Sequence, residues 1–292
     1  MVNGGGTVAV GFFDGVHAGH REILRGADVA MTFRRHPLDV LAPGREPPLL
    51  MDFESRLAAL RDTGVREIVA LDFDADFAAL SPEDFISRHL AGFASVRCGA
   101  NWRFGAGGRG DAALLAAAGK SVTVVPYADY GGETVSSTRI RAAVGEGRVA
   151  DAAAMLGRPW EFRGRVRRGK GLGAEFGFPT VNLAPPDGGT YALPPHGVYA
   201  VRMLGADAVA NWGVAPTMRD AAWPEPVLEV HLLGPVRDRT FPAEGDAVPV
   251  AFAARLRDER AFGSTDELCC QIAADCDRAR RIFADAKEDR RA

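Results

Sequence analysis

The stretch VGFFDGVHAGH, residues 10 to 20, leads from an apolar run into Asp14, closely spaced glycines, and two histidines three residues apart. The run TVAVGFF that contains its beginning is typical of a β-strand. In an open α/β sheet, ligands bind beyond the carboxyl ends of the strands, where glycines let backbone amides approach a phosphate at the start of a helix. The stretch therefore predicts an anion-binding turn at the end of a first strand.

Four further apolar runs follow before residue 128: DVAMTF, EIVALDF, SVRCGA and SVTVVPY. They alternate with helical segments, and this alternation predicts a parallel sheet. Two of the helices have recognisable ends: FESRLAALRDTG ends at Gly64, and SPEDFISRHLAGF has Ser81 as N-cap and Pro82 at its first position. The first crossover has only the residues between Asp14 and Asp28, which is near the minimum of about a dozen.

The composition is that of a globular protein: of 292 residues, 47% are hydrophobic and 25% charged, which favours two domains. A net charge of -3 excludes a global basic field for nucleic acid or an anionic membrane. We expect neither export nor membrane anchoring, since no signal-like or spanning run is present. Four cysteines without metal-ligand spacing indicate reduced thiols and a cytoplasmic location. The oligomeric state stays open.

The pattern changes at about Arg158 to short strands separated by Gly and Pro: WEFRGRVRRG, GVYAVRML, AVANWGV, VLEVHLLG and AVPVAFAARLR. These strands predict a small barrel. A final helix begins with a capping box of Ser264 and Glu267. It has an apolar face for packing on the barrel, formed by Leu268, Ile272, Cys276, Ala279 and Phe283. The predicted domains are residues 1–157 and 158–292.

Two segments of the first domain carry candidate anion ligands. If a helix begins near Ala18, His17 and His20 lie one turn apart at its start, with their imidazole N–H groups facing an anion. The segment SSTRIR, residues 136–141, is a second Ser/Thr-rich helix start with two arginines. Taken singly, the histidines are compatible with ordinary loop residues, and SSTRIR with an ordinary N-cap whose arginines are solvated.

In the second domain GAEFGFPTVN, residues 173–182, places Thr180 and Asn182 two apart, on one face of a strand. Hard oxygen ligands beside glycines suit Mg²⁺ and phosphate, although Gly-Phe-Pro is also common turn chemistry. Glu229 and His231 lie on the strand face opposite Val230. A carboxylate there is suited to general-base catalysis or is an outward-facing strand residue.

Together, GFFDGVHAGH and SSTRIR resemble the nucleotidyltransferase signature in the form found in bacterial bifunctional riboflavin kinase/FAD synthetases. The similarity includes TFRRHP (32–37), GANWRFG (99–105) and GRVADAAAMLGRP (147–159), then GFPTVN, GVYA (197–200), NWGVAPT (211–217) and LEVHLL (228–233). The resemblance implies a Rossmann-like FMN adenylyltransferase domain followed by a β-barrel riboflavin kinase domain. Both would use ATP and Mg²⁺, with riboflavin, FMN and FAD as substrates and products.

The resemblance also implies residue roles. The expected catalytic residues are His17, His20, Arg139 and Glu229, with the histidines on ATP phosphates and Glu229 as base for the ribityl 5′-hydroxyl. Thr180 and Asn182 would hold the ATP-bound metal. The expected nucleotide or flavin contacts are Gly11, Phe12, Asp14, Gly15, Gly19, His36, Asn101, Ser136, Ser137, Thr138, Arg141, Gly171, Gly173, Gly177, Thr180 and Asn182.

Several positions depart from the family pattern. Arg35 stands where proline is usual, Ala215 where arginine is common, and residues 234–246 lack the acidic-aromatic stretch ending in Tyr-Gly. The segment from His20 to Thr32 is shortened, and residues 172 and 174 lack the usual arginines. Two alternatives therefore stay open: a diverged paralogue with one half-reaction or a flavin analogue as substrate, and a non-catalytic flavin- or nucleotide-binding regulator.

Overall fold

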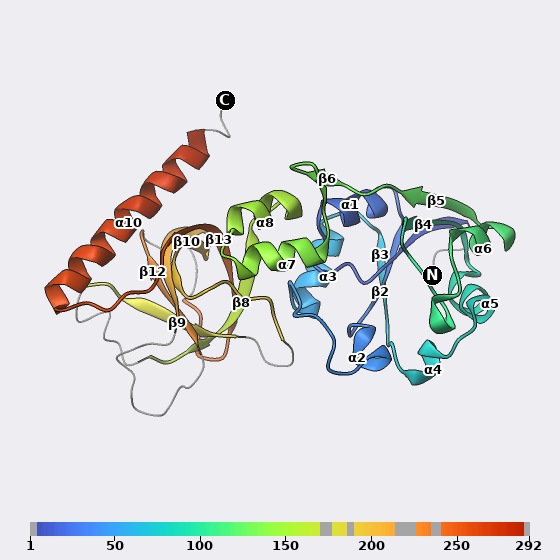
Figure 1. Cartoon of the computed structure of the whole chain (residues 1–292), viewed down its shortest axis with the longest axis horizontal. Coiled ribbons are helices and arrows are strands. Elements are labelled where there is room, and N and C mark those ends of the chain that lie inside the picture. Colours follow the sequence, from blue (N-terminus) through green and yellow to red (C-terminus); the bar gives the residue numbers. More distant parts are fainter. Residues whose placement is uncertain (1–4, 170–176, 186–189, 214–225, 235–240, 289–292) are drawn as a thin grey trace. The chain divides into compact units, whose positions relative to one another are not determined.

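The structure is a computed structural model, and it describes residues 5–169, 177–185, 190–213, 226–234 and 241–288. The chain forms two compact units, Met1–Arg139 and Ile140–Ala292 (Figure 1). The second unit takes in helix α8 (Val149–Leu156), which packs on strands β8 and β13 of the barrel described below. The domain boundary at residues 157/158, inferred from the change in composition, stays a prediction.

The N-terminal unit is built on a five-stranded parallel sheet of order β3-β2-β1-β4-β5. Each strand overlaps one of the five apolar runs: β1 (Gly6–Val10), β2 (Val29–Phe33), β3 (Glu67–Leu71), β4 (Phe93–Gly99) and β5 (Ser121–Val125). The three inner strands, β2, β1 and β4, contribute buried residues to the core, among them Val29, Val8 and Val96. The predicted parallel sheet is confirmed.

Short helices connect these strands. The first crossover contains only α1 (Ala18–Leu24), so seven helical residues suffice to return the chain for parallel pairing of β1 with β2. The other helical elements of this unit are α2 (Leu38–Leu41), α3 (Phe53–Arg61), α4 (Ala75–Ala78), α5 (Pro82–Phe85), a π-helical turn (Ile86–Leu90), a 3₁₀ turn (Ala106–Gly108) and α6 (Ala112–Ala117). Ser81 caps α5 as predicted, but the helix expected over residues 81–93 becomes π-helical after Phe85.

Strand order fixes where this sheet can bind a ligand. The chain passes from β1 to β2 and β3 on one side and places β4 and β5 on the other side of β1. The loops that follow β1 and β4 therefore diverge, and such a switch point leaves a crevice at the carboxyl ends of the strands. The stretch after Val10 and the residues after Gly99 lie at this edge. A hairpin of β6 (Asp129–Tyr130) and β7 (Glu133–Thr134) then leads into α7 (Ser137–Gly145).

The second unit is a closed antiparallel barrel of order β10-β11-β12-β9-β8-β13, as the short strands predicted. Its strands are β8 (Trp160–Arg167), β9 (Thr180–Ala184), β10 (Gly197–Met203), β11 (Ala206–Gly213), β12 (Val227–Leu232) and β13 (Ala247–Arg257). Alternate residues point inward, and buried aromatic side chains from four strands fill the interior: Trp160, Phe162, Tyr199, Trp212 and Phe252. The interior is therefore packed, so polar residues gather on the outer face.

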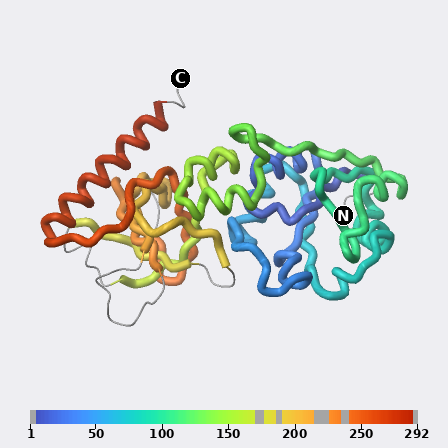
Figure 2. Tube along the Cα trace, viewed as in Figure 1, coloured from blue at the N-terminus to red at the C-terminus, as the bar shows by residue number. Residues whose placement is uncertain are grey.

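The C-terminal helix α10 (Thr265–Glu288) packs along the outside of the barrel against β10 and β11 (Figure 2). Cys276, Ala279 and Phe283 are buried on its predicted apolar face. Its first turn differs from a full capping box: Ser264 Oγ accepts from Glu267 N at 3.2 Å, but the Glu267 carboxylate accepts from Gly263 N at 3.0 Å rather than from Ser264 N. Among the described residues, no helix is long and apolar enough to cross a membrane.

Replacing Phe283 by alanine tests the packing of α10 on the barrel. Phe283 is 3% exposed, so Phe283→Ala should lower the free energy of unfolding of the barrel unit by about 3 kcal/mol, measured by chemical denaturation. Phe241→Ala, the same change at a side chain that is 55% exposed, should lower it by less than about 1 kcal/mol. Equal effects of the two changes would show that α10 is not packed as described.

Candidate functional site

The loop after β1 has a strained backbone. Phe13 and Val16 adopt positive φ values of 58° and 43°, a region that branched residues such as valine rarely enter. Between them Val16 N donates to Phe13 O at 3.0 Å, and Gly15 supplies the φ of 84° that closes this tight turn. Strain of this kind costs about 1–3 kcal/mol per residue and persists where surrounding contacts impose it, often at functional sites.

Asp14 supplies two of those contacts. Its buried carboxylate accepts from Leu50 N, at 3.0 Å to Oδ1 and 3.1 Å to Oδ2. Its main-chain oxygen accepts from Ser137 Oγ at 2.9 Å. The structure therefore brings together the two motifs, GFFDGVHAGH and SSTRIR, that lie more than a hundred residues apart in the sequence. It also shows the Asp14 carboxylate bonded to the loop at Leu50.

A buried arginine that the sequence did not single out supports the same loop. Arg56, 2% exposed on α3, donates from Nη2 to Phe33 O at 2.6 Å, and its guanidinium lies 3.9 Å from the centre of the Phe12 ring. Burial lowers the pKa of Arg56 to about 10, against the opposing effect of Asp14 and Asp52, so the side chain stays charged at neutral pH. Thr32, also fully buried, donates to Phe12 O at 3.0 Å.

His17 and His20 lie together at the start of α1, as predicted. Their rings stack with centroids 3.6 Å apart and 17° between planes. The predicted direction of the N–H groups needs a correction, because His17 Nδ1 accepts from His20 N at 3.3 Å and caps the helix. A neutral His17 then carries its proton on Nε2, because Nδ1 acts as the acceptor. An alanine at Gly19 would place its Cβ 3.3 Å from His17 Cε1, so glycine leaves room for this stack.

The pKa of the His20 imidazole is strongly shifted. Burial, and secondly the neighbouring His17, hold the pKa of the His20 imidazole well below its ordinary value of 6.5. Its Nδ1 is buried and has no hydrogen-bond partner among the described residues. A buried polar atom of this kind commonly receives its partner from a ligand or an ordered water.

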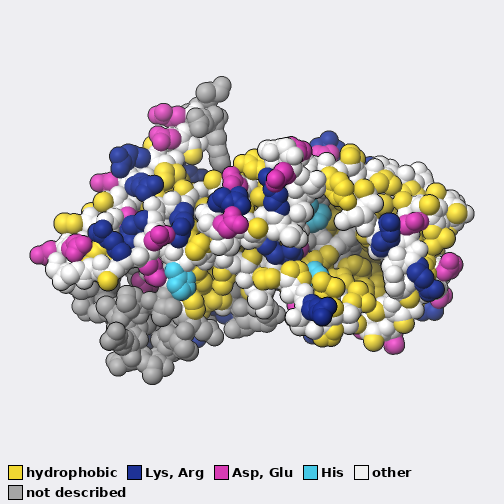
Figure 3. All heavy atoms as spheres, viewed as in Figure 1, with side chains coloured by type: hydrophobic (Ala, Val, Ile, Leu, Met, Phe, Trp, Pro, Cys, Tyr) yellow, Lys and Arg dark blue, Asp and Glu magenta, His cyan; other side chains and the backbone are white. Residues whose placement is uncertain are grey.

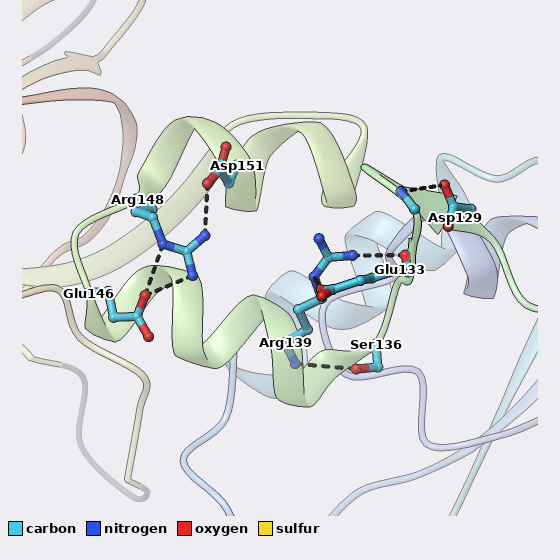
Figure 4. A network of polar contacts seen from close by, with 8 residues as sticks. Asp129, Glu133, Ser136, Arg139, Glu146, Arg148 and Asp151 are labelled. Carbon is cyan, nitrogen blue, oxygen red and sulfur yellow. Dashed lines mark hydrogen bonds and ion pairs between the residues drawn. The ribbon is translucent and has the colours of Figure 1, made fainter.

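Arg139 is held by the hairpin that precedes α7 (Figure 4). Its Nε lies 3.2 Å from Glu133 Oε2, its Nη1 donates to Glu133 O at 2.8 Å, and its guanidinium lies 5.6 Å from the centre of the Tyr130 ring. Arg139 N donates to Ser136 Oγ at 3.2 Å, so Ser136 caps this turn. Arg139 therefore pairs with the Glu133 carboxylate in this structure. To bind a phosphate, it would have to give up this ion pair.

The remaining predicted residues of this unit lie on the same edge of the sheet. His36 follows β2 and packs edge-on against Phe12 with ring centroids 4.6 Å apart. Asn101 is exposed just after β4, and Thr138 lies in the first turn of α7. Arg141, further along α7, belongs to the second unit. Gly11 accommodates the Phe13 ring, because an added Cβ would lie 2.9 Å from Phe13 Cε1. Figure 3 shows a hollow in this unit, lined mainly by hydrophobic side chains with histidine at its edge.

The barrel aligns polar residues in one row across four strands. Arg167 on β8 pairs with Asn182 on β9, Asn182 with Glu229 on β12, and Glu229 with Asn211 on β11. Directly paired residues share a face, and Leu228 and Val230 on either side of Glu229 are fully buried, so the row lies on the outside of the barrel. Thr180 pairs with His231 beside this row, and His231 Nδ1 lies 3.0 Å from Pro179 O. The predicted face shared by Glu229 and His231 is confirmed.

Glycines bring the backbone close to this row. An added Cβ at Gly169 would overlap the Asn182 amide, so the chain passes directly over Asn182. Gly177, with a φ of 83°, begins the turn into Thr180. Gly171, Gly173, Ala215 and residues 235–240 lie outside the described residues. The predictions made for them therefore have no structural counterpart here.

Glu229 has a second carboxylate near it. Burial, and secondly the negative charge of Glu259, raise the pKa of the Glu229 carboxyl group. Glu259 Oε1 accepts from Asn211 Nδ2 at 3.3 Å, and Glu259 Oε2 lies 3.7 Å from His196 Nδ1. Neither Asn211 nor Glu259 was predicted. The strand register exposes Asn211 as a neighbour of Glu229, and this register could not be read from the sequence without the strand order.

Both halves of the chain match known protein families. Residues 2–139 match the family model described as FAD synthetase, and residues 156–283 match the one described as riboflavin kinase. The bifunctional riboflavin kinase/FMN adenylyltransferase of Escherichia coli strain K12 is 36% identical over 96% of this chain and 93% of its own length. This chain belongs to the bifunctional riboflavin kinase/FMN adenylyltransferase family.

Other relatives agree over the same extent. The family member from Bacillus subtilis strain 168 is 31% identical over 97% of this chain and 94% of its own length. A solved structure from Streptococcus pneumoniae, titled a macrolide-efflux protein, is 30% identical with a TM-score of 0.80, covering 95% of this chain and 94% of that one. Both modules of the family, the adenylyltransferase and the kinase, are thus present in one chain.

The low pKa of His20 predicts its charge in solution. Without nucleotide the His20 imidazole should be neutral at about pH 6, where an exposed histidine is largely protonated. Imidazole ¹⁵N shifts measured against pH, with His20 assigned from His20→Gln, test this. The unfolded chain binds a proton at His20 near pH 6.5 and the folded chain does not, so His20→Gln should also lessen the loss of stability below that pH. A His20 that is protonated at about pH 7 would contradict the described burial.

Proposed function

We propose that this enzyme makes FMN from riboflavin and FAD from FMN, using ATP twice, in two separate sites on the two units. The kinase forms a bond between the ribityl 5′-oxygen and the γ-phosphorus and releases ADP. The adenylyltransferase forms a bond between an FMN phosphate oxygen and the α-phosphorus of ATP and releases pyrophosphate. The observation that carries this proposal is the bond from Ser137 Oγ to Asp14 O, because it joins the two nucleotide motifs into one site.

In the adenylyltransferase site, charge develops on phosphoryl oxygens as pyrophosphate leaves, and fixed donors at those oxygens do most of the catalysis. We assign this role to His17 and His20, whose stacked rings stand at the start of α1. His17 would donate through Nε2, since its Nδ1 is occupied. Arg139 would join them on leaving Glu133, with Ser137 and Thr138 as further nucleotide contacts. Asn101, after β4, would face the flavin side.

In the kinase site, Glu229 would take the proton of the ribityl 5′-hydroxyl as that oxygen attacks the γ-phosphorus. Its position supports this role, because the carboxylate stands on a rigid strand with Asn182 and Asn211 paired on either side. Arg167, in the same row, would offer positive charge to the phosphates.

Magnesium enters this proposal with ATP, as part of the substrate. Thr180 and Asn182 offer the neutral hard oxygens that Mg²⁺ accepts when phosphates and waters complete its shell. The backbone passing over Asn182 at Gly169 supports a phosphate held close to the same residue. Magnesium would neutralise charge on the phosphates, while Asn182 and Thr180 fix their position next to Glu229.

We also propose a cytoplasmic location. All four cysteines lie within the described residues and are free thiols, two of them buried. Free thiols are the usual state of cysteine in a reducing compartment.

Separate substitutions test whether the two sites are independent. His17→Ala with His20→Ala should reduce FAD formation by at least about 100-fold and leave FMN formation unchanged, while Glu229→Ala should do the reverse. Purified protein is incubated with riboflavin, ATP and Mg²⁺, and the flavins are separated by chromatography. Wild-type protein that makes only FMN, or FAD only from added FMN, has one half-reaction. Binding without product would support a regulator, and loss of both reactions in each correctly folded variant would refute the two-site proposal.

A further inference from the structure

We propose that Glu259 is a positioning residue of the riboflavin kinase site, which it serves by holding the Asn211 amide beside Glu229. This inference rests on the proposed kinase function, and it adds a residue that lies beyond β13, outside the row of paired strand residues.

The first support is the geometry of the contact. Asn211 and Glu229 are directly paired on neighbouring strands, so their side chains leave the barrel side by side. Asn211 Nδ2 donates to Glu259 Oε1 at 3.3 Å. With one N–H committed to Glu259, the amide cannot turn over, and its oxygen and second N–H keep a fixed orientation next to Glu229. A carboxylate acceptor also makes this a charge-assisted hydrogen bond.

The second support is that the barrel leaves a space for Glu259. Gly213, two residues after Asn211 on the same face of β11, lies under the Glu259 carboxylate, and an added Cβ there would overlap Oε1. His196 Nδ1 lies 3.7 Å from the other oxygen, Oε2. Three separate segments, at His196, on β11 and after β13, therefore define the position of one carboxylate.

The third support is electrostatic. The negative charge of Glu259 contributes, after burial, to the raised pKa of the Glu229 carboxyl group, in keeping with the contact between Glu259 and Asn211, the strand partner of Glu229. Glu259 is therefore near enough to act on the base through Asn211, while its side chain remains 31% exposed and bonded to neither Thr180 nor Asn182 among the described contacts.

The test compares variants of the full chain by kcat and KM for FMN formation. Glu259→Ala should lower kcat about ten-fold with KM for ATP within about two-fold, because Glu229 and the ATP ligands remain but the amide orientation is lost. Glu259→Gln should keep at least about half of the wild-type kcat, since its amide oxygen accepts the same bond. Gly213→Ala, which displaces the carboxylate without removing it, should resemble Glu259→Ala.

A double-mutant cycle tests whether Glu259 acts through Asn211. Asn211→Ala should lower kcat as Glu259→Ala does, and the double variant should be no slower than the slower single variant. Glu161→Ala, an exposed carboxylate on the outer face of β8, is the matched control and should have wild-type kinetics. FAD formation from added FMN, measured in every variant, reports on the other unit, and thermal unfolding reports on the barrel.

Three results would overturn the positioning role in a wild-type enzyme that makes FMN. They are an unchanged kcat in Glu259→Ala, a Glu259→Gln variant as slow as Glu259→Ala, and additive effects of the Asn211 and Glu259 changes. A wild-type chain that binds riboflavin and makes no FMN would instead refute the proposed kinase function. This result is therefore distinct from a failure of the positioning role alone.

Discussion

The buried carboxylate of Asp14 is the constraint on which the candidate site at the carboxyl edge of the parallel sheet depends. It bonds to Leu50 N while its own main-chain oxygen receives Ser137 Oγ, so one residue joins segments centred on residues 14, 50 and 137. A buried carboxylate is costly without such partners, and Arg56 provides positive charge nearby. The positive φ values of Phe13 and Val16 persist because these bonds hold the turn between them. His17 and His20 follow this turn directly, so its geometry sets their position.

The barrel positions its polar side chains in a different way. Its polar row does not depend on a strained loop, since strand register alone sets Arg167, Asn182, Glu229 and Asn211 next to one another. A filled aromatic interior makes the strands rigid, and rigid strands hold side chains more precisely than loops do. The two candidate sites therefore differ in construction: one is a tight loop at a sheet edge, and the other is the outer face of a closed barrel.

Much of this could be predicted because local patterns carry it. The apolar runs located all five parallel strands, and the alternation around Glu229 placed this residue outside the barrel. The motif residues from Gly11 to His20 and from Ser136 to Arg139 were predicted to form one site, and Ser137 Oγ contacts Asp14 O in the structure. What the sequence could not supply were partners fixed by tertiary structure. In the sequence, Arg56 is one arginine of an ordinary helix, and only its burial against Phe12 shows its role. Glu259 belongs to a charged loop in the sequence, and only the strand order places Asn211 next to it.

The direction of the imidazoles was beyond prediction for a related reason. Spacing placed His17 and His20 one turn apart, but the helix cap uses His17 Nδ1, and only the local backbone geometry decides this. Likewise, the motif gave no sign that Arg139 would be paired with Glu133 of its own hairpin.

The most direct test of the account is Asp14→Ala, assayed for both products in one reaction. Alanine removes the carboxylate that accepts from Leu50 N and one of the two carboxylates near Arg56, so the turn that carries the histidines should lose its geometry. FAD formation should fall at least about 100-fold while FMN forms at the wild-type rate. FAD formation at the wild-type rate would show that the Asp14 contacts do not hold the site together.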